Sequence, residues 1–439
     1  MKTKLCLVLI SLVFNLLSVA AQQPRAINHE LPIPPLFYKE KILKGDYLGA
    51  MTQLKRREAE YRASPQFKDM FLQVMAPLAS QLGNYNEAYS YFDEFTSVYS
   101  KPQSDITDSP LDKYSARKAL EVIGSVAERR QVLMINEEHD TPMHRAFTAS
   151  LLPILYKKGF RYFAAETIVD EEINLRGYPV QKSGFYSADP VYADLVRRAI
   201  KLGFKVVSYD LSPKNCKNPP DNPNYCQDVR ERGQAQNIYD RILKIDPQAK
   251  VLVHVGRTHN RKTKLDDWAL MGWHFWQITG IEPFTIDQTQ MSERSRPEFE
   301  TPTFRYAVKK WNFSEPTVFQ IEKGKYRSEP GYDLTVFHPR AIYRNGRPTW
   351  LEMDSSRKTV KIDLKKLNLP AQNKQFDETE PILVQAYQTN ESVDAVPIDQ
   401  VILYPKQSVS VLMLPKGKFS IRAIDRTGKI LSQYEKKTR

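Results

Sequence analysis

The stretch from Gln131 to Glu166, QVLMINEEHDTPMHRAFTASLLPILYKKGFRYFAAE, decides the fold of this chain. It contains two short apolar runs, 132–135 and 162–165, and between them a segment with helical periodicity over 145–158. Two such runs around one helix predict a parallel β-α-β unit. A polar cluster, Asn-Glu-Glu-His-Asp, follows the first run, and a glutamate ends the second. Sites in open parallel sheets form at the carboxyl ends of the strands, so the stretch also predicts a site.

Two later apolar runs, 205–209 and 250–255, extend this unit and are separated by helical patterns. This alternation predicts an α/β fold in which helices flank a central, mostly parallel sheet. Ionisable side chains end or follow all four predicted strands. These side chains are Glu137, His139, Glu166, Asp210, His254 and His259, and we expect four of them, Glu137, His139, Glu166 and His259, to line one cleft at the carboxyl edge of the sheet.

The flanking segments predict two further modules around an α/β domain at 111–355. Residues 22–110 are mainly helical, and GDYLGA at 45–50 recurs as GNYNEA at 83–88. Such a recurrence resembles tetratricopeptide-type helix pairs, although a plain helical packing module fits the pattern equally well. Residues 356–439 alternate between short strands and turn signals, which predicts a small β-sandwich.

Residues 1–21 are expected to be a signal peptide. Lys2 and Lys4 give it a positive start, 5–17 is apolar, and small residues at 19–21 form a cleavage site. The apolar segment is too short to span a bilayer, and no later stretch is apolar enough. We therefore expect a secreted or periplasmic protein without a transmembrane segment.

Composition and cysteine placement narrow the function classes further. The chain has 64 Lys and Arg against 51 Asp and Glu, a formal net charge of +13. These basic residues are spread along the sequence, which argues against a nucleic-acid partner and leaves association with anionic cell-surface material open. Cys216 and Cys226 lie close together in a Pro/Asn-rich loop, so in an exported protein they predict a disulfide. No G-x-S-x-G elbow supports a serine nucleophile.

Four motifs resemble those of a known superfamily. The pattern at 136–140, with His144 beyond it, resembles the G-E-x-H-D…H motif of ChaN-type proteins. Glu166 resembles the glutamate that ends the second strand in those proteins. The stretch 230–237, RERGQAQN, resembles the esterase pattern R-E-x-x-M-A-x-N, and 254–259, HVGRTH, resembles the closing G-x-x-H motif. Together they resemble the superfamily that joins erythromycin esterases, the haem-binding uptake protein ChaN and the Tiki proteases.

The resemblance covers roughly 120–290 and has two departures. Asn136 stands where the first motif has glycine, and Gln234 stands where the esterase pattern has methionine. Loss of the glycine is expected to restrict the approach of backbone or ligand beside Glu137. These two departures leave open whether the protein is active, but they do not change the predicted fold.

The residues and the resemblance together predict a hydrolase of esters, or less readily of amides, acting on a small molecule or a peptide. A carboxylate beside an imidazole fixes its tautomer and raises its basicity, so the imidazole can take a proton from water. By resemblance to the esterases, His139 is the base. Glu137 or Glu166 orients its ring, and His259 stabilises the charge that develops on the substrate. Further polar residues are expected to support these four: Asp140, His144, Asp210, Arg230, Glu231 and His254.

Two alternatives stay open at this stage, although we expect no obligatory cofactor. His139, His144, Glu166 and His259 are a suitable nitrogen and oxygen set for zinc or manganese, and the Tiki relatives are metal-dependent. Haem binding of the ChaN type is the other alternative, because histidine and tyrosine side chains can ligate its iron. The tyrosines expected near the cleft are Tyr178, Tyr186, Tyr192 and Tyr209.

Overall fold

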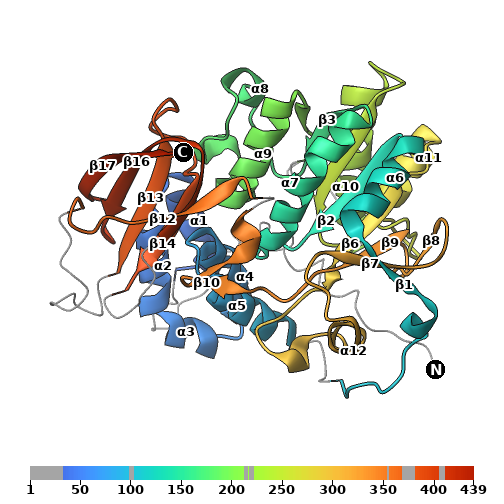
Figure 1. The fold of residues 1–439 in the computed structure, drawn as a ribbon, viewed down its shortest axis with the longest axis horizontal. Helices are drawn as coiled ribbons and strands as arrows, with labels where there is room; N and C mark the ends of the chain where they lie inside the picture. Colours follow the sequence, from blue (N-terminus) through green and yellow to red (C-terminus); the bar gives the residue numbers. More distant parts are fainter. Residues whose placement is uncertain are drawn as a thin grey trace.

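The computed structural model shows a mixed α/β protein (Figure 1). It describes residues 33–97, 103–211, 216, 222–352, 355–367, 381–404 and 411–439. The predicted signal peptide, 1–21, lies outside the described residues. Within them, no helix is long and apolar enough to cross a membrane.

A nine-stranded sheet is the centre of the described α/β part, in the order β1-β7-β9-β6-β2-β5-β3-β4 with β8 beside β7. From β4 to β9 along this order the neighbouring strands are parallel, and β7 then adds antiparallel pairs with β9, β1 and β8. The sheet is therefore mixed. The strands are β1 Ser115–Lys118, β2 Val132–Glu137, β3 Phe160–Ala165, β4 Lys205–Ser208, β5 Lys250–Gly256, β6 Phe284–Met291, β7 Thr317–Glu322, β8 Lys325–Tyr326 and β9 Leu334–Phe337.

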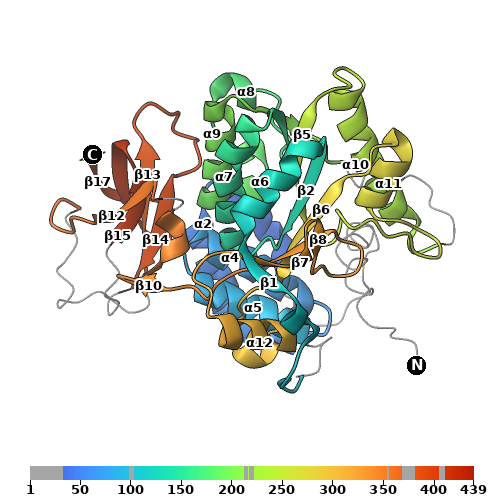
Figure 2. The same ribbon diagram turned by 45° about the vertical axis from the view of Figure 1, so that its right-hand side comes forward.

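Helices cover both faces of this sheet, which is why its central strands are continuous apolar runs. Leu133 and Ile135 of β2 share a core with α6, α7 and α9, whereas Val132 and Met134 share another with α10 and α11. Figure 2 shows the two groups of helices on either side of β2 and β5. The helices are α6 Ala119–Arg129, α7 Pro142–Lys157, α9 Pro190–Leu202, α10 Tyr225–Ile238 and α11 Met271–Thr279.

The N-terminal helices repeat one local design. Gly45 and Gly83 each follow the end of a helix at positive φ, 81° and 76°, which glycine adopts without steric cost. The chain then starts α2 and α5, so the two copies of the sequence repeat have the same local structure. The helical elements here are η4 Pro35–Tyr38, α1 Lys39–Leu43, α2 Tyr47–Arg56, α3 Glu58–Ala63, α4 Lys68–Gln81 and α5 Tyr85–Ser97.

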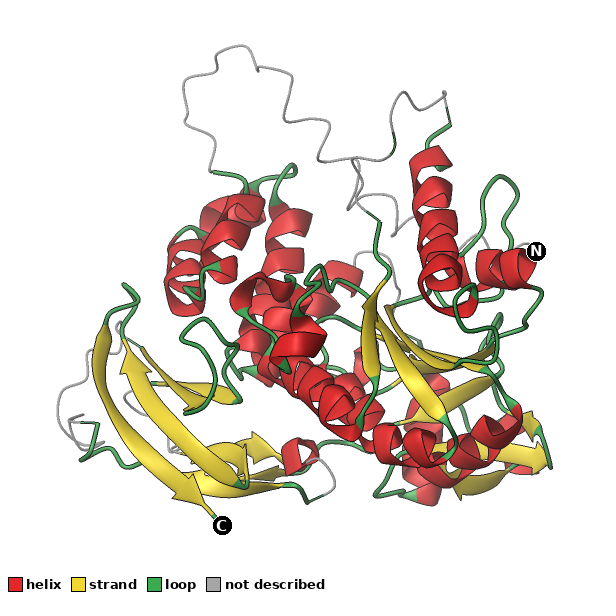
Figure 3. Ribbon diagram, turned by 90° about the horizontal axis from the view of Figure 1, so that it is seen from above, coloured by secondary structure: helices red, strands yellow, loops and turns green. Residues whose placement is uncertain are grey.

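Two antiparallel sheets form the C-terminal part, one of β12 and β15 and one in the order β14-β13-β16-β17. Apolar side chains from both sheets share one core. Figure 3 shows these strands separated from the central sheet by helices. The strands are β12 Arg357–Lys361, β13 Ile382–Gln388, β14 Asp399–Leu403, β15 Val411–Pro415, β16 Gly417–Ile424 and β17 Ile430–Thr438.

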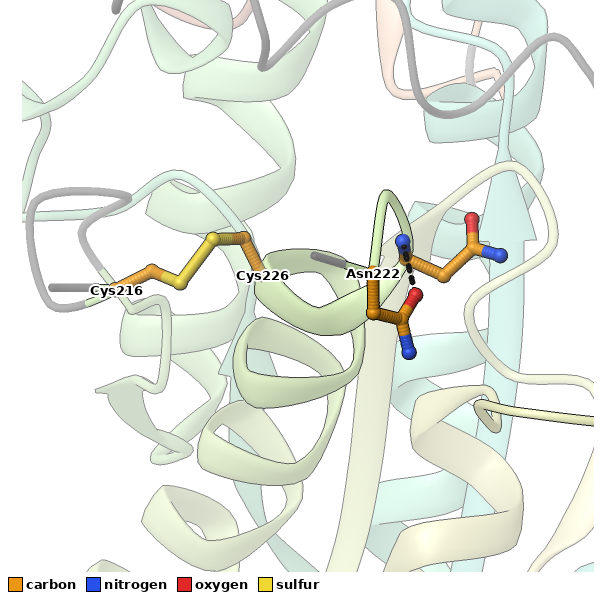
Figure 4. The surroundings of a disulfide bond; sticks show 4 residues. Cys216, Asn222 and Cys226 are labelled. Carbon is orange, nitrogen blue, oxygen red and sulfur yellow. Dashed lines mark hydrogen bonds between the residues drawn. A yellow bond between two sulfur atoms is a disulfide. The ribbon is translucent and has the colours of Figure 1, made fainter. Parts of the chain in front are cut away.

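Shorter elements join these parts. They are η5 Pro110–Lys113, α8 Ile173–Arg176, η6 Gln181–Ser183, η7 Tyr186–Ala188, the π-helix η9 Tyr239–Leu243, η10 Pro297–Phe299, α12 Pro302–Trp311, β10 Tyr343–Arg344, β11 Arg347–Pro348 and η11 Thr349–Glu352. The predicted disulfide joins Cys216 to Cys226 in the first turn of α10 (Figure 4). It therefore ties Cys216 to the helix that carries Arg230 and Glu231.

Candidate active site

Glu137, the last residue of β2, is buried and paired with an arginine. Its Oε2 accepts a hydrogen bond from Arg145 Nε at 2.6 Å, and its Oε1 accepts one from Nη2 at 2.7 Å. Arg145 also lies 3.2 Å from Asp189, the residue that caps α9. Burial raises the pKa of Glu137, but the charge and hydrogen bonds of Arg145 outweigh it and hold the pKa well below its usual range.

His139 is oriented by Glu137. Its Nδ1 lies 2.8 Å from Glu137 Oε1. An ionised carboxylate can only accept, so Nδ1 carries the proton and Nε2 is left as an acceptor. The side chain keeps 20% of its surface exposed. His139 is thus positioned to take a proton from a group that approaches its Nε2.

Two further groups enclose the His139 ring. Tyr186 stacks on it with ring centroids 3.8 Å apart and planes 14° apart. Gly256, at the end of β5, passes so close that a Cβ there would lie 2.6 Å from both Cε1 and Nε2 of the ring. The ring is therefore held by a carboxylate, an aromatic face and a glycine backbone.

Glu166, directly after β3, holds a different residue. Its Oε1 accepts from Arg230 Nη2 at 2.6 Å, and its Oε2 accepts from the backbone N–H of Gly256. Burial raises the pKa of Glu166, but the charges of His259 and Arg230 lower it to about 2. Glu137, rather than Glu166, is the carboxylate in contact with the His139 ring nitrogen.

His259 forms a second histidine–glutamate pair in the same cluster. Its Nδ1 lies 2.5 Å from Glu231 Oε1, and its Nε2 lies 3.2 Å from Arg230 Nη1. Since a guanidinium only donates, this Nε2 is also an acceptor. Burial lowers the pKa of His259, but the charge and hydrogen bond of Glu231 outweigh it, so the pKa lies above its usual value. Arg230 and Glu166 connect this pair to the Gly256 backbone beside His139.

The two departures from the motifs both take part in hydrogen bonds. Gln234 donates through Nε2 to Asp210 Oδ1 at 2.7 Å, a bond that methionine could not make, and Arg230 Nη2 lies 3.5 Å from the same oxygen. Asn136 directs its amide away from Glu137, donating to the Arg257 carbonyl at 2.7 Å. The side chain of Asn136 therefore does not restrict the approach of backbone or ligand beside Glu137.

Three residues expected to support the site, His144, His254 and Asp140, are buried beside it, and His144 is also a metal candidate. His144 accepts from the N–H of Glu138 at 3.1 Å, and its Nε2 lies 3.1 Å from Ser292 Oγ, so both ring nitrogens are engaged by the protein. His254 is buried with its Nε2 3.6 Å from Glu137 Oε2, and burial lowers its pKa to about 4. Asp140 is buried, and burial together with the charge of Glu138 raises its pKa to about 7.

The candidate metal set is consequently not assembled. No group of three or more His, Cys, Asp or Glu in the described part of the chain is arranged to hold a metal ion. Both ring nitrogens of His144 face Glu138 and Ser292, and both ring nitrogens of His259 face Glu231 and Arg230, so neither histidine directs a nitrogen at a shared ion.

Two of the four tyrosines considered as haem ligands, Tyr192 and Tyr209, have their hydroxyls engaged by the backbone. The Tyr192 hydroxyl donates to the Glu166 carbonyl at 2.7 Å, and the Tyr209 hydroxyl donates to the His254 carbonyl at 3.0 Å. Both side chains are buried, and burial raises the pKa of each hydroxyl well above its usual value. These two residues brace the strand ends.

Comparison with known proteins adds little. No protein-family model matches the sequence, and no curated protein matches it. A solved structure described as "Bacterial protein toxins" is similar at a TM-score of 0.29 and 11% sequence identity, over 51% of this chain. The chain spans 45% of the length of that structure. A likeness at this TM-score supports no conclusion about fold or function.

Proposed function

We propose that this protein is an exported hydrolase of esters that uses water as the nucleophile and His139 as the general base. The proposal rests on the contact between Glu137 and His139. Arg145 keeps Glu137 ionised, so the carboxylate fixes the proton on Nδ1 and leaves Nε2 free of one. As the imidazole accepts the proton of an attacking water, the adjacent negative charge stabilises the imidazolium that forms.

Arg230 and His259 supply the second half of the proposed reaction. Attack of water on an ester carbonyl places negative charge on the carbonyl oxygen, and preorganised donors stabilise that charge. Arg230 is held by Glu166 and Asp210, and its Nη1 meets His259. We therefore assign charge stabilisation to Arg230, and the positioning of Arg230 to Glu166, Asp210 and His259.

The family, the finer fold assignments and the location form the rest of the proposal. The four motifs support membership of the erythromycin esterase, ChaN and Tiki superfamily. The matching glycine-to-helix transitions before α2 and α5 support a tetratricopeptide-like pair, and the shared core of the two C-terminal sheets supports a β-sandwich. The disulfide is in keeping with export to an oxidising compartment.

A screen of ester and peptide substrates, with and without a chelator, tests the reaction. Removal of a general base costs about 10²–10⁴-fold in rate, so His139→Ala should lose activity by that factor. His274→Ala is the matched control, because His274 also contacts a carboxylate, Asp228 at 2.8 Å, outside the site. Equal loss in both variants, or full activity in His139→Ala, would refute the assignment. Activity lost to the chelator and restored by zinc or manganese would favour the metal alternative.

A further inference from the structure

The segment between β3 and α9, residues 167–188, brings an aromatic ring to the proposed base. Tyr186 opens the short helix η7 and lies nearly parallel to the His139 ring at 3.8 Å. This is ordinary van der Waals stacking distance, so the two rings are in full contact. Gly256 closes on the same imidazole through its backbone. The Glu137 hydrogen bond alone would still let the ring tilt, and Tyr186 with Gly256 removes that freedom.

The N-terminal helices hold the segment in this place. The hydroxyl of Tyr47 in α2 lies 2.5 Å from Gln181 Oε1 and 2.9 Å from the Ala188 carbonyl. Gln81 at the end of α4 donates through Nε2 to the Phe185 carbonyl at 3.2 Å. Ala188 is buried in the apolar core that α2, α4 and α5 build. The residues on both sides of Tyr186 are thus fixed by helices that lie about a hundred residues or more earlier in the chain.

The C-terminal part holds residues 179–181 of the same segment. The N–H of Gln181 donates to the Asp394 carbonyl at 2.9 Å, and the N–H of Val396 donates to the Pro179 carbonyl at 3.1 Å. An isolated antiparallel bridge pairs Val180 with Ala395. Both flanking parts of the chain therefore meet on one irregular segment, and that segment ends on the ring of His139.

We propose that Tyr186 is a positioning residue for His139, and that the N-terminal helices serve the site by holding Tyr186 against it. The inference rests on the proposed function in one respect, namely that His139 acts as a base. A base must point Nε2 at its water within narrow limits, and a misplacement of about 1 Å can cost roughly 10²-fold in rate. Stacking on a fixed aromatic ring keeps Nε2 of His139 directed at the water.

Steady-state kinetics on an ester substrate give the first test. Tyr186→Leu removes the aromatic face and should lower kcat roughly 10–100-fold, with KM changed by less than about twofold, since orientation and not substrate affinity is lost. Tyr186→Phe keeps the face and should restore kcat to within about threefold. Tyr306→Leu is the matched control, because Tyr306 packs on the ring of Trp311 in α12, outside the site. Tyr47→Phe should lower kcat in the direction of Tyr186→Leu.

Kinetic results of two kinds would overturn the inference. One is a kcat for Tyr186→Leu equal to that of the unchanged protein. The other is a Tyr186→Phe variant as slow as Tyr186→Leu, because a role of the hydroxyl is not a role of the stacked face.

Chemical modification gives a second test that needs no substrate. Diethyl pyrocarbonate acylates an accessible, unprotonated imidazole nitrogen, and peptide mass spectrometry measures the rate at His139. Tyr186→Leu should be modified faster than the unchanged protein, whereas Tyr186→Phe and Tyr306→Leu should be modified at its rate. If no ester or amide is hydrolysed, the proposed function fails while this contrast still decides the positioning role. Equal modification rates in Tyr186→Leu and the unchanged protein would overturn it.

Discussion

Replacing Gly256 with alanine should disable the site without unfolding the protein. The backbone of Gly256 does not have positive φ, so alanine meets no backbone strain there. Its new Cβ would instead lie 2.6 Å from Cε1 and Nε2 of His139 and 2.9 Å from Oε2 of Glu166. The single added carbon therefore acts on the proposed base and on the carboxylate that holds Arg230.

The size of the effect follows from the distance that the ring must move. Non-bonded carbon atoms rest about 3.5–4.0 Å apart, so the imidazole has to retreat by about 1 Å. Tyr186 stacks on the ring at 3.8 Å and Glu137 holds Nδ1 at 2.8 Å, so the ring cannot retreat without breaking its alignment. A displacement of about 1 Å can cost roughly 10²-fold in rate, which is about 2.7 kcal/mol in the activation barrier.

The assay compares kcat/KM and urea unfolding for two alanine variants. Gly124→Ala in α6 is the control, because its Cβ would lie 2.9 Å from Cγ2 of Ile154, a tight contact outside the site. We expect Gly256→Ala to lose about two orders of magnitude in kcat/KM and Gly124→Ala to lose none. A Gly256→Ala protein that keeps its rate, or one whose lost activity is matched by a lost unfolding transition, would refute the reasoning.

Three further predictions concern charge and protonation. Arg145→Met leaves the buried Glu137 carboxylate unpaired, so urea unfolding should show a loss of about 3–5 kcal/mol, and an unchanged midpoint would contradict it. Glu231→Gln removes the charge that raises the pKa of His259, so NMR titration of the ring should show a lower pKa than in the unchanged protein. Burial lowers the pKa of His338 to about 3, so the unfolded chain takes up a proton from about pH 6.5 downward that the folded protein does not. As the pH falls from about 6.5 to 4, the free energy of unfolding of His338→Asn should therefore fall less steeply than that of the unchanged protein. The difference in slope is up to about 1.4 kcal/mol per pH unit, and equal slopes for the two proteins would count against this account.

The parallel strands could be predicted because burial on both faces leaves a plain signature in the sequence. Each of β2 to β5 is a short apolar run, and the topology of a parallel sheet then brings the residues at its strand ends together. Glu137, Glu166 and His259 could be found in this way without knowing any contact. Of the antiparallel strands that complete the sheet, β1 is exposed, β7 is exposed at its end and β8 has two residues, so they leave a weaker pattern.

The supports of His139 could not be predicted in this way. Arg145 lies on α7 among residues with ordinary helical periodicity, and its charge gives no sign that it faces Glu137. Tyr186 lies in a segment without periodicity, whose course is set by Tyr47 and Ala395, far away in the sequence. Contacts between residues so distant in the chain depend on how the N-terminal helices, the α/β part and the C-terminal sheets pack together. The local sequence pattern does not predict them.

His144 shows that nearness in sequence does not decide which way a side chain points. It follows His139 by five residues and starts in the first turn of α7. Its Nε2 faces Ser292 and its Nδ1 accepts from the N–H of Glu138, and burial lowers its pKa well below the usual value. A histidine at a helix start can face either side of the preceding strand, and the sequence does not tell which.

Asn136 shows how the pleat of a strand decides where a substitution acts. Successive side chains of a strand point to opposite faces, and β2 continues through Glu137, so Asn136 cannot crowd the carboxylate that follows it. Its amide lies on the β6 side, where Oδ1 accepts from the N–H of Gln288 at 2.8 Å and Nδ2 donates to the Arg257 carbonyl at 2.7 Å. Arg257 has positive φ, 46°, a conformation that the surrounding structure must hold in place. Glycine is therefore required at position 256, beside His139. Asn136 instead stabilises the strained Arg257, the residue that follows Gly256.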